Sequence, residues 1–409
     1  MKVLHVIPSV GPLRGGPSVM IRTLTRELVK AEMMVDVATT DDNGPDRLNV
    51  VLGQPVIDDG VTYRYFRRQT LFYSFSWPLT RWLSRHVMDY DLVHIHALFS
   101  YPSISAAFWA KRYRVPYIVR PLGVLTHWSM RNRRPWLKQV SFKLIERRIL
   151  SGAAAVHYTS EQEILEAADL GATHRVVLIP NAIETPPDIA KNARGHFRKR
   201  YPELENRPII LFLSRLDPKK GLDLLLPAFA DVVKEHPRTA LVIAGNGEPS
   251  FVEALKQKAT RLGIAREIVW TEFLSGDDKW AALADADIFV LPSYSENFGI
   301  AVLESLLCGV PVVISNKVGI HHEISESAAG LVVPCDATPL ANAIGILLAD
   351  KDLRAQMGNA ARRCAQIKFS LNCTTQQLLH LYQNVTRVGL NNSSSPSLTQ
   401  AIDRKTTAN

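Results

Sequence analysis

Short apolar runs alternate with amphipathic stretches of helical period along most of the chain, and this alternation restricts the possible folds more than any other feature. Buried strands that alternate with helices are typical of parallel sheets joined by right-handed crossovers. The sequence therefore predicts an α/β fold. The predicted strands are Val3–Pro8, Val35–Thr39, Leu92–Ala97, Tyr117–Val119, Ala155–Tyr158, Val176–Ile179, Ile209–Leu213, Ala240–Ala244, Ile268–Trp270, Ile288–Leu291, Val312–Ile314 and Leu331–Val333. The predicted helices include Pro17–Lys30, Leu79–Met88, Trp136–Leu150, Leu222–Glu235, Pro249–Leu262 and Ala301–Cys308.

The alternation restarts near residue 208, and the strands are too many for one ordinary sheet. We therefore predict two doubly wound, Rossmann-like domains that face each other across a cleft. The stretch between them is rich in Pro, Lys, Arg and polar residues, with a short basic helix at Ala193–Tyr201. The predicted boundaries are residues 1–181 for the first domain, 182–207 for a linker, 208–370 for the second domain, 371–389 for a helix that returns toward the first domain, and 390–409 for a disordered tail.

Cysteine usage and hydropathy predict the compartment. The four cysteines form no Cys-x-x-Cys pair and have no zinc spacing, which favours free thiols in a reducing environment. Met1–Pro12 is too short and too interrupted by Pro and Gly for a signal peptide, so it is interpreted as the first strand. No apolar stretch reaches the roughly 18–20 residues that span a bilayer. We expect a cytoplasmic protein, attached at most to the inner face of the cell membrane.

The positive charge of the chain is concentrated in one region. Residues 111–150 hold eleven Lys or Arg against one acid, Glu146, whereas the whole chain carries a net charge of only +9. The rest of the chain is therefore close to neutral. Within this segment Trp136, Leu137, Val140, Leu144 and Ile145 form an apolar stripe bordered by cations, which is typical of a helix lying on an anionic membrane. Two other interpretations stay open. In the first, the apolar stripe packs on the sheet and the cations form a solvated face. The second, a nucleic-acid surface, is only weakly supported because no recognised binding module surrounds the segment.

The segment Pro292–Ile300 with Glu304 is the strongest functional signal. A buried strand ends just before Pro292, and a helix begins near Gly299. The N-terminus of a helix offers unpaired N–H groups to an anion. Glu296 and Glu304 stand eight positions apart, about 12 Å along a helix, so they are too far apart to act as a hydrolytic pair and suit two parts of one elongated ligand. The alternative is that both are ordinary surface acids.

Arg215 and Lys220 follow the strand Ile209–Leu213, where Pro218 and Gly221 shape a turn before the next helix. The carboxyl ends of strands are where doubly wound domains bind ligands. Two cations fixed there suit a departing diphosphate. A solvated basic turn is the competing interpretation.

The remaining motifs are weak individually. Gly15 and Gly16 precede a helix and can bring backbone N–H groups to a phosphate, without forming a dinucleotide fingerprint or a P-loop. His94 and His96 share one face of a strand but have no nearby Asp, Glu or Cys, so a sugar or phosphate contact by His96 is favoured over a metal site. Two further loops complete the set. They are Gly245, Asn246 and Gly247 after a strand, and Asn181 where the linker begins.

Together these motifs resemble family 4 of the retaining glycosyltransferases, in the family's order and over roughly residues 1–385. The resemblance implies a GT-B fold, with an acceptor-binding first domain and a second domain that binds a nucleotide sugar. It implies that Arg215 and Lys220 stabilise the leaving diphosphate, that Glu296 contacts the donor sugar and that Glu304 contacts the ribose. The other implied site residues are Gly15, Gly16, His96, Asn181, Gly245, Asn246, Gly247, Asn297, Phe298, Gly299 and Ile300. Ala182 departs from the family, which commonly has Gly after this Asn.

The resemblance further implies metal-independent transfer of a hexose, with no cofactor, to a glycan or lipid-linked acceptor in cell-surface polysaccharide or glycolipid synthesis. A nucleotide-sugar epimerase and a non-catalytic partner subunit remain as alternatives. An NAD-dependent oxidoreductase is disfavoured because the glycine fingerprint is absent. The base, the sugar, the acceptor and the oligomeric state do not follow from the sequence.

Overall fold

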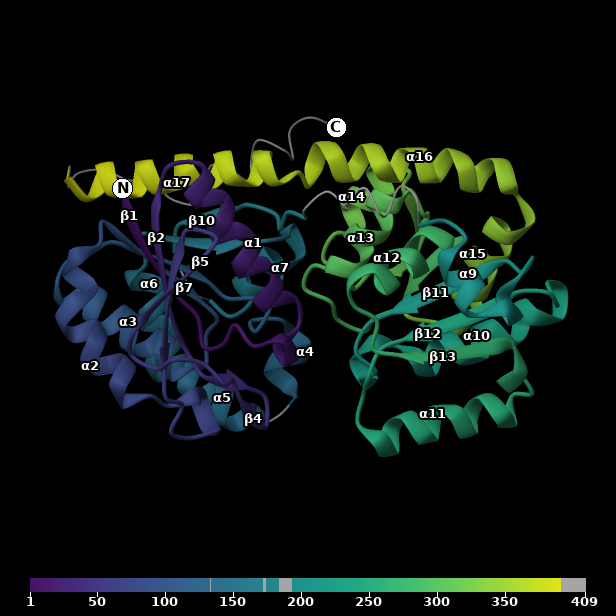
Figure 1. Ribbon diagram of the computed structural model, residues 1–409, viewed down its shortest axis with the longest axis horizontal. Helices are drawn as coiled ribbons and strands as arrows, with labels where there is room; N and C mark the ends of the chain where they lie inside the picture. The colour runs from purple at the N-terminus through teal and green to yellow at the C-terminus, as the bar shows by residue number, and fades with distance from the viewer. Residues whose placement is uncertain (133, 172–173, 184–192, 391–409) are drawn as a thin grey trace. The chain divides into compact units, whose positions relative to one another are not determined.

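The computed structural model describes residues 1–132, 134–171, 174–183 and 193–390. The chain divides into two compact units, each built around its own sheet (Figure 1). The first unit comprises Met1–Thr159, Glu163–Pro180 and the chain from Thr374 onward; the second comprises Ser160–Gln162 and Asn181–Cys373. The predicted tail and part of the predicted linker, residues 391–409 and 184–192, lie outside the described residues.

The first unit holds a sheet of order β10-β9-β8-β7-β1-β2-β6-β5, parallel except for β5. Its strands are β1 (Lys2–Val6), β2 (Met34–Thr40), β5 (Pro55–Asp58), β6 (Val61–Phe66), β7 (Leu92–His96), β8 (Tyr117–Arg120), β9 (Ala155–Tyr158) and β10 (Val176–Leu178), with a small separate ladder of β3 (Asp42–Asn43) and β4 (Asp46–Arg47). Its helices are α1 (Gly16–Lys30), α2 (Trp77–His86), α3 (Tyr101–Arg112), α4 (His127–Arg131), α5 (Pro135–Ser141), α6 (Arg147–Gly152), α7 (Glu161–Ala168) and α17 (Leu371–Leu390).

Alternation along the strands divides the first core between the two faces of this sheet. Leu4 and Val6 of β1 belong to one buried cluster, to which α2, α3 and α6 contribute. Val3 belongs to the other cluster, which α1 and α17 cover. The C-terminal helix reaches this face through four buried side chains, Leu378, Leu381, Tyr382 and Val385.

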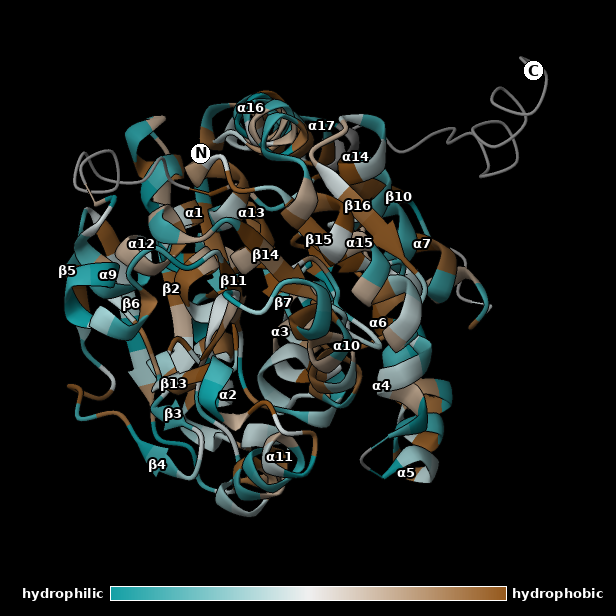
Figure 2. Ribbon diagram, turned by 90° about the vertical axis from the view of Figure 1, so that its right-hand side faces the viewer, coloured by the Kyte–Doolittle hydropathy of each residue, from teal (hydrophilic) through white to brown (hydrophobic). Residues whose placement is uncertain are grey.

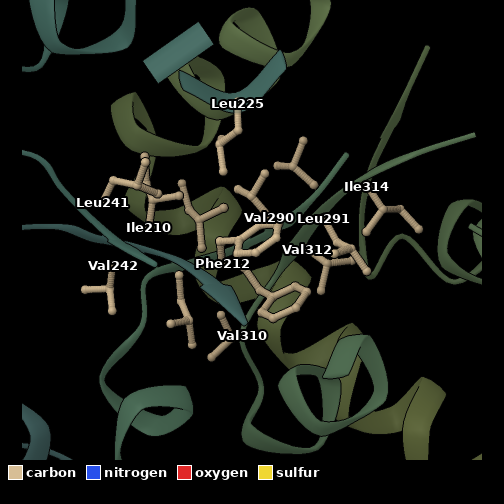
Figure 3. Packing of buried hydrophobic residues seen from close by; sticks show 14 of the residues in the cluster. Ile210, Phe212, Leu225, Leu241, Val242, Val290, Leu291, Val310, Val312 and Ile314 are labelled. Carbon is tan, nitrogen blue, oxygen red and sulfur yellow. The ribbon is translucent and has the colours of Figure 1, made fainter. Parts of the chain in front are cut away.

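The second unit holds a fully parallel sheet of order β13-β12-β11-β14-β15-β16. Its strands are β11 (Ile209–Leu213), β12 (Ala240–Ala244), β13 (Ile268–Glu272), β14 (Ile288–Leu291), β15 (Val312–Ser315) and β16 (Gly330–Val333). Its helices are α9 (His196–Arg200), α10 (Leu222–Glu235), α11 (Pro249–Arg261), α12 (Gly276–Asp285), α13 (Ile300–Cys308), α14 (His321–Glu326), α15 (Ala337–Ala349) and α16 (Lys351–Lys368). Aliphatic and aromatic side chains such as Phe212 and Leu225 fill its core (Figure 3).

This strand order marks the edge of the second sheet at which doubly wound domains generally bind ligands. Successive strands run outward in one direction from β11 and in the other from β14, and these two strands are neighbours. A crevice opens at such a topological switch point, outside the carboxyl ends of the two strands. The loops after β11 and β14 carry the strongest predicted motifs.

The α/β prediction with parallel sheets is confirmed, but the predicted linker differs from the structure. Ala193, Phe197 and Leu204 are buried in the core of the second unit. The carboxylate of Asp285 also accepts the backbone N–H of Arg198 at 3.0 Å, which ties α9 to the end of α12. Residues 193–207 therefore pack as part of the second unit, because their few apolar side chains find a complementary surface there.

Candidate functional site

The loops after β11 and β14 meet through an ion pair between Lys220 and Glu296. Lys220 ends a short 3₁₀ turn, Pro218–Lys220, whose N-cap is Asp217. Both side chains are largely shielded from solvent, although Glu296 stands in a loop. Burial on its own raises the pKa of Glu296, but the ammonium groups of Lys220 and Lys219 outweigh it and hold that pKa below its ordinary value. Glu296 is therefore a carboxylate at neutral pH.

The Glu296 loop is held in place by the segment that follows β15. The backbone N–H of Glu296 donates to the carbonyl of Lys317 at 2.9 Å, and Gly319 donates back to the carbonyl of Glu296 at 2.8 Å. Gly319 lies so close to the loop that a Cβ atom there would come within 1.9 Å of the Asn297 carbonyl oxygen. The site thus includes a third loop, which the sequence reasoning missed.

Glycine permits the equally close contact between the β11 and β12 loops. A Cβ atom on Gly245 would lie 1.8 Å from the Ser214 carbonyl oxygen, and one on Gly247 would lie 2.3 Å from that of Leu216. The backbone N–H of Leu216 donates to the carbonyl of Asn246 at 2.8 Å. These two glycines therefore hold the backbone on either side of Arg215, whose side chain is exposed.

Helix α13 begins directly after the Glu296 loop. Gly299 is its N-cap, with φ +90°, a backbone conformation that side-chain-bearing residues rarely adopt. Glu304 lies on this helix and is nearly buried, and its carboxylate pairs with the Lys279 ammonium of α12 at 2.7 Å. Burial raises the pKa of Glu304 above its ordinary value, against the opposing effect of Lys279.

The structure positions the other predicted residues of this motif differently. Phe298 is buried and packs edge-on against Phe369, with ring centroids 5.7 Å apart, so its side chain belongs to the core rather than to a donor site. Ile300 also packs against the core. Asn297 contributes its backbone carbonyl to a 3.2 Å hydrogen bond from Ser160, and Asn181 is buried in the same unit.

The predicted residues of the first unit lie at the carboxyl ends of β1 and β7, which are also neighbours at a switch point. Gly15 has φ +71° and ψ −135°, and Gly16 is the first residue of α1. His96, by contrast, is completely buried, and its Nε2 lies 3.0 Å from Nδ1 of His5. In this structure the imidazole of His96 therefore offers no exposed atom for the predicted contact with a sugar, because the ring packs among the buried rings of His5 and His94.

His96 belongs to a buried cluster with His5, His94, His157 and Tyr382. The Tyr382 hydroxyl lies 2.7 Å from Nδ1 of His94. Burial, aided by the nearby charge of Arg120, lowers the pKa of both His5 and His157 to about 3. All four imidazoles are therefore neutral at neutral pH, since burial also lowers the pKa of His94 and His96.

Ring nitrogens of His5, His94 and His96 lie within 4.8 Å of one another, a spacing that fits a metal ion. The sequence predicted only the pair His94 and His96. His5 joins them because the register of the sheet sets His5 of β1 directly beside His94 of β7. The positive charge of Arg120 acts on all three rings and opposes a further cation among them. This cluster is therefore better explained as a neutral, hydrogen-bonded part of the core.

Two family models match the chain, one in each unit. The model of the Glycosyl transferase 4-like domain matches residues 15–182, and that of the Glycosyl transferases group 1 matches residues 194–364. Both matches are to glycosyltransferase domains, and together they identify the chain as a glycosyltransferase. The second match contains Arg215, Lys220, Glu296 and Glu304.

Similar glycosyltransferases differ in the share of this chain that their sequences match. A GDP-mannose-dependent α-(1-6)-phosphatidylinositol monomannoside mannosyltransferase of Mycolicibacterium smegmatis is 34% identical over 54% of this chain and 59% of its own length. A D-inositol 3-phosphate glycosyltransferase of Corynebacterium jeikeium is 27% identical over 94% of this chain and 95% of its own length. A crystal structure of Anabaena HepE with UDP and glucose superposes with a TM-score of 0.74, at 20% identity, over 94% of this chain and all of that one. These likenesses confirm the GT-B class of fold, with two Rossmann-like domains.

The site of this glycosyltransferase also contains three lysines that were not among the predicted residues. Lys219 precedes Lys220, Lys279 pairs with Glu304, and Lys317 holds the Glu296 loop through its backbone. Lys279 lies on α12, for which no helix was predicted, and no sequence spacing links it to Glu304. The adjacent Lys219 was visible in the sequence as part of the basic turn.

Proposed function

We propose that this chain transfers a hexose from a nucleotide-diphosphate sugar to an acceptor hydroxyl with retention of anomeric configuration. The observation that carries the proposal is the convergence of Lys220 and Glu296 at the switch point of the second sheet, beside the N-terminus of α13. A cation and a helix N-terminus are the groups that stabilise a departing diphosphate, whose negative charge grows as the glycosidic bond breaks. The exposed guanidinium of Arg215 adds a bidentate donor at the same edge.

The two glutamates are assigned to different parts of the donor. Glu296 is ionised and tethered at both its backbone N–H and its carbonyl, so it is suited to accept hydrogen bonds from the sugar hydroxyls. Glu304 lies further along α13 and is assigned to the ribose hydroxyls. In this mechanism the leaving phosphate helps to deprotonate the acceptor on the same face of the sugar. The chain's own cations supply the charge stabilisation.

A thermal-shift screen tests the donor class. The protein is heated with UDP, GDP, ADP and their sugars, and the nucleotide bound most tightly gives the largest rise in melting temperature. Mass analysis of products with and without an acceptor then separates transfer from epimerisation, because an epimerase changes the donor when no acceptor is present. No shift with any nucleotide would contradict the proposal.

We infer that the acceptor is a glycan or lipid-linked molecule presented at the inner face of the cell membrane. Two relatives are named for phosphatidylinositol monomannoside and for D-inositol 3-phosphate. No helix among the described residues is long and apolar enough to cross a membrane. A protein that acts on a lipid-linked acceptor needs a surface that contacts the membrane.

The segment of α4, α5 and α6, which is labelled in Figure 2, carries exposed side chains suited to such a surface. Val140 and Leu144 of the predicted apolar stripe are exposed, whereas Phe142, Ile149 and Leu150, which lie outside the stripe, are buried in the first core. The exposed side continues in Leu71, Phe72, Trp136 and Ile145. The same segment carries Arg131, Arg134, Lys138, Lys143, Arg147 and Arg148, and its Arg133 lies outside the described residues.

We call these exposed apolar side chains and the cations of this segment the apolar–basic patch. Trp136 leaves 68% of its surface in solvent, a large exposure for an apolar side chain. The Arg134 guanidinium lies 5.7 Å from the ring centre of Phe72, which joins two distant segments of the chain in one patch. Aromatic side chains bordered by cations suit the interface of an anionic bilayer, where each basic residue adds about 1 kcal/mol.

Co-sedimentation with vesicles tests the patch. The wild type is expected to pellet with phosphatidylglycerol-containing vesicles but not with neutral ones, and an Arg131/Arg134→Glu variant is expected to stay in the supernatant. An Arg261/Arg266→Glu variant is the matched control, because it changes the charge equally at exposed positions of the second unit. Equal recovery of wild type and the patch variant in the supernatant would leave a water-soluble acceptor as the better assignment.

A further inference from the structure

Glu304 has an ion-pair partner, Lys279, whose function the nucleotide assignment leaves unexplained. Its side chain is only 10% exposed, and Oε1 accepts a hydrogen bond from Lys279 Nζ at 2.7 Å. Lys279 comes from α12, so the pair joins two helices of the second unit. The same ammonium lies 4.8 Å from the ring centre of Trp280, which restricts its position further.

We propose that Lys279 is a positioning residue that keeps Glu304 ionised and oriented for the ribose of the donor. This inference rests on the proposed function, because it assumes that Glu304 receives the ribose hydroxyls. Two neighbouring hydroxyls each donate a hydrogen bond, and a carboxylate can accept both. Lys279 engages Oε1, which fixes the plane of the carboxylate and leaves its remaining lone pairs for the ligand.

The ionisation of Glu304 depends on few neighbours. Burial raises its pKa, and the charge and hydrogen bond of Lys279 oppose that rise. Cys308 on the same helix is a neutral thiol, since burial raises its pKa to about 12. Arg362 of α16 donates to the backbone carbonyl of Cys308 at 2.9 Å. Lys279 is thus the cation bonded directly to Glu304, and its removal leaves a buried carboxyl that takes up a proton more readily.

A protonated carboxyl accepts fewer hydrogen bonds and presents an O–H to donors that need an acceptor. Loss of the Lys279 charge is therefore expected to weaken nucleotide binding through the ribose, and to do so increasingly as the pH falls. An arginine at this position keeps the charge and is expected to preserve binding. A lysine that served only to hold α12 against α13 would give neither the pH dependence nor the requirement for ribose hydroxyls.

The experiment measures the dissociation constants of two probes between pH 5.5 and 8.5. The probes are the nucleoside diphosphate, among UDP, GDP and ADP, that stabilises the wild type most, and its 2′,3′-dideoxy analogue. For K279M we expect about tenfold weaker binding of the ribonucleotide, with the loss growing toward low pH, and unchanged binding of the dideoxy analogue. K279R should resemble the wild type. The chemical shift of the Glu304 carboxyl carbon, followed by NMR in the wild type over the same pH range, reports the ionisation of this group without a Lys279 variant.

The outcomes separate this inference from the proposed function. If the wild type binds both probes equally, the ribose assignment of Glu304 fails and the inference fails with it. If the wild type prefers the ribonucleotide and K279M retains that preference at every pH, only the inference on Lys279 is overturned. Equal weakening of both probes in K279M would show a general structural effect and would also overturn it.

Discussion

Lys220 and Glu296 form an ion pair although 76 positions separate them in the chain. They lie in the loops after β11 and β14, the two strands between which the sheet changes direction. In the absence of a donor each side chain neutralises the other in a largely shielded site. A bound diphosphate and sugar would share these charges, with the anion beside Lys220 and the sugar hydroxyls beside Glu296.

Replacing Lys220 by alanine should lower kcat by about 10²–10³-fold, because it removes a fixed charge that stabilises the leaving group. Lys234→Ala is the matched control, since Lys234 is an exposed lysine paired with Asp231 on α10. Steady-state kinetics of both variants, with circular dichroism to verify folding, decide the question. A near-normal kcat for the Lys220 variant would refute the role given to this lysine.

Gly245→Ala should disrupt the loop that holds Arg215. The added Cβ would lie 1.8 Å from the Ser214 carbonyl oxygen, and the backbone has φ +147°. Because backbone rather than a flexible side chain is the obstacle, we expect a loss of roughly 2 kcal/mol or more in unfolding free energy, together with weaker nucleotide binding. Urea unfolding and nucleotide titration measure the two effects.

Gly345→Ala supplies the control for that prediction. Gly345 lies inside α15, and a Cβ there meets nothing within 4 Å. Alanine should therefore stabilise the protein by about 0.5–1 kcal/mol, since glycine is the weaker helix former. If the two glycine variants had equal stability, the close contact between the β11 and β12 loops would not be important.

Glu146 should make stability depend on pH in an unusual direction. Its carboxyl is fully buried in the π-helical turn Phe142–Glu146, where Ser141 Oγ lies 3.3 Å from Oε1. Burial raises its pKa from 4.5 to about 7, against the opposing hydrogen bonds of Ser141 and the Phe99 backbone. The folded state therefore holds a proton between these values that the unfolded state releases, and stability falls as the pH rises from 4.5 to 7.

Glu146→Gln removes this proton uptake while nearly preserving shape. The variant should gain up to about 3 kcal/mol relative to wild type between pH 4.5 and 7, at 1.36 kcal/mol per unit of pKa shift. Urea midpoints at several pH values measure the difference. A constant difference between the two proteins across this range would mean that Glu146 has an ordinary pKa.

Much of the fold followed from the apolar runs, and each of the twelve predicted strands corresponds to a strand of the structure. Such runs occur because both faces of a parallel sheet are covered. The strand β6, Val61–Phe66, was missed because its alternating aromatic and polar residues lack a continuous apolar run. Its pairing with β2 is a tertiary interaction that no local pattern encodes.

The site could be predicted only where its residues follow strands in sequence. Lys220 and Glu296 were found because strand ends of a doubly wound sheet converge, but their ion pair required the structure. Lys279 lies on a different helix from its partner Glu304, and nothing in the sequence relates the two. The burial of His96 was equally hidden, because it depends on the neighbouring strand β1, whose His5 lies against the His96 ring.

The buried histidines predict a loss of stability in acid that opposes the effect of Glu146. Burial lowers the pKa of His5 and His157 from 6.5 to about 3, and those of His94 and His96 are lowered as well. Between these values the unfolded chain binds protons that the folded protein excludes. Stability therefore rises with pH up to about 6.5 and falls as the pH drops below it, by up to 1.36 kcal/mol per pH unit for each histidine.

Four histidines outnumber the single opposing carboxyl, so we expect the wild type to lose stability steeply between pH 6.5 and 5. Urea midpoints of wild type and His157→Asn across this range test the claim, since that variant removes one titrating ring and should reduce the slope by about one proton. His127→Asn is the control, because His127 is an exposed histidine that pairs with Asp169. A wild-type midpoint that stays level from pH 6.5 to 5 would show that the cluster accepts protons in the folded state, which a neutral buried core excludes.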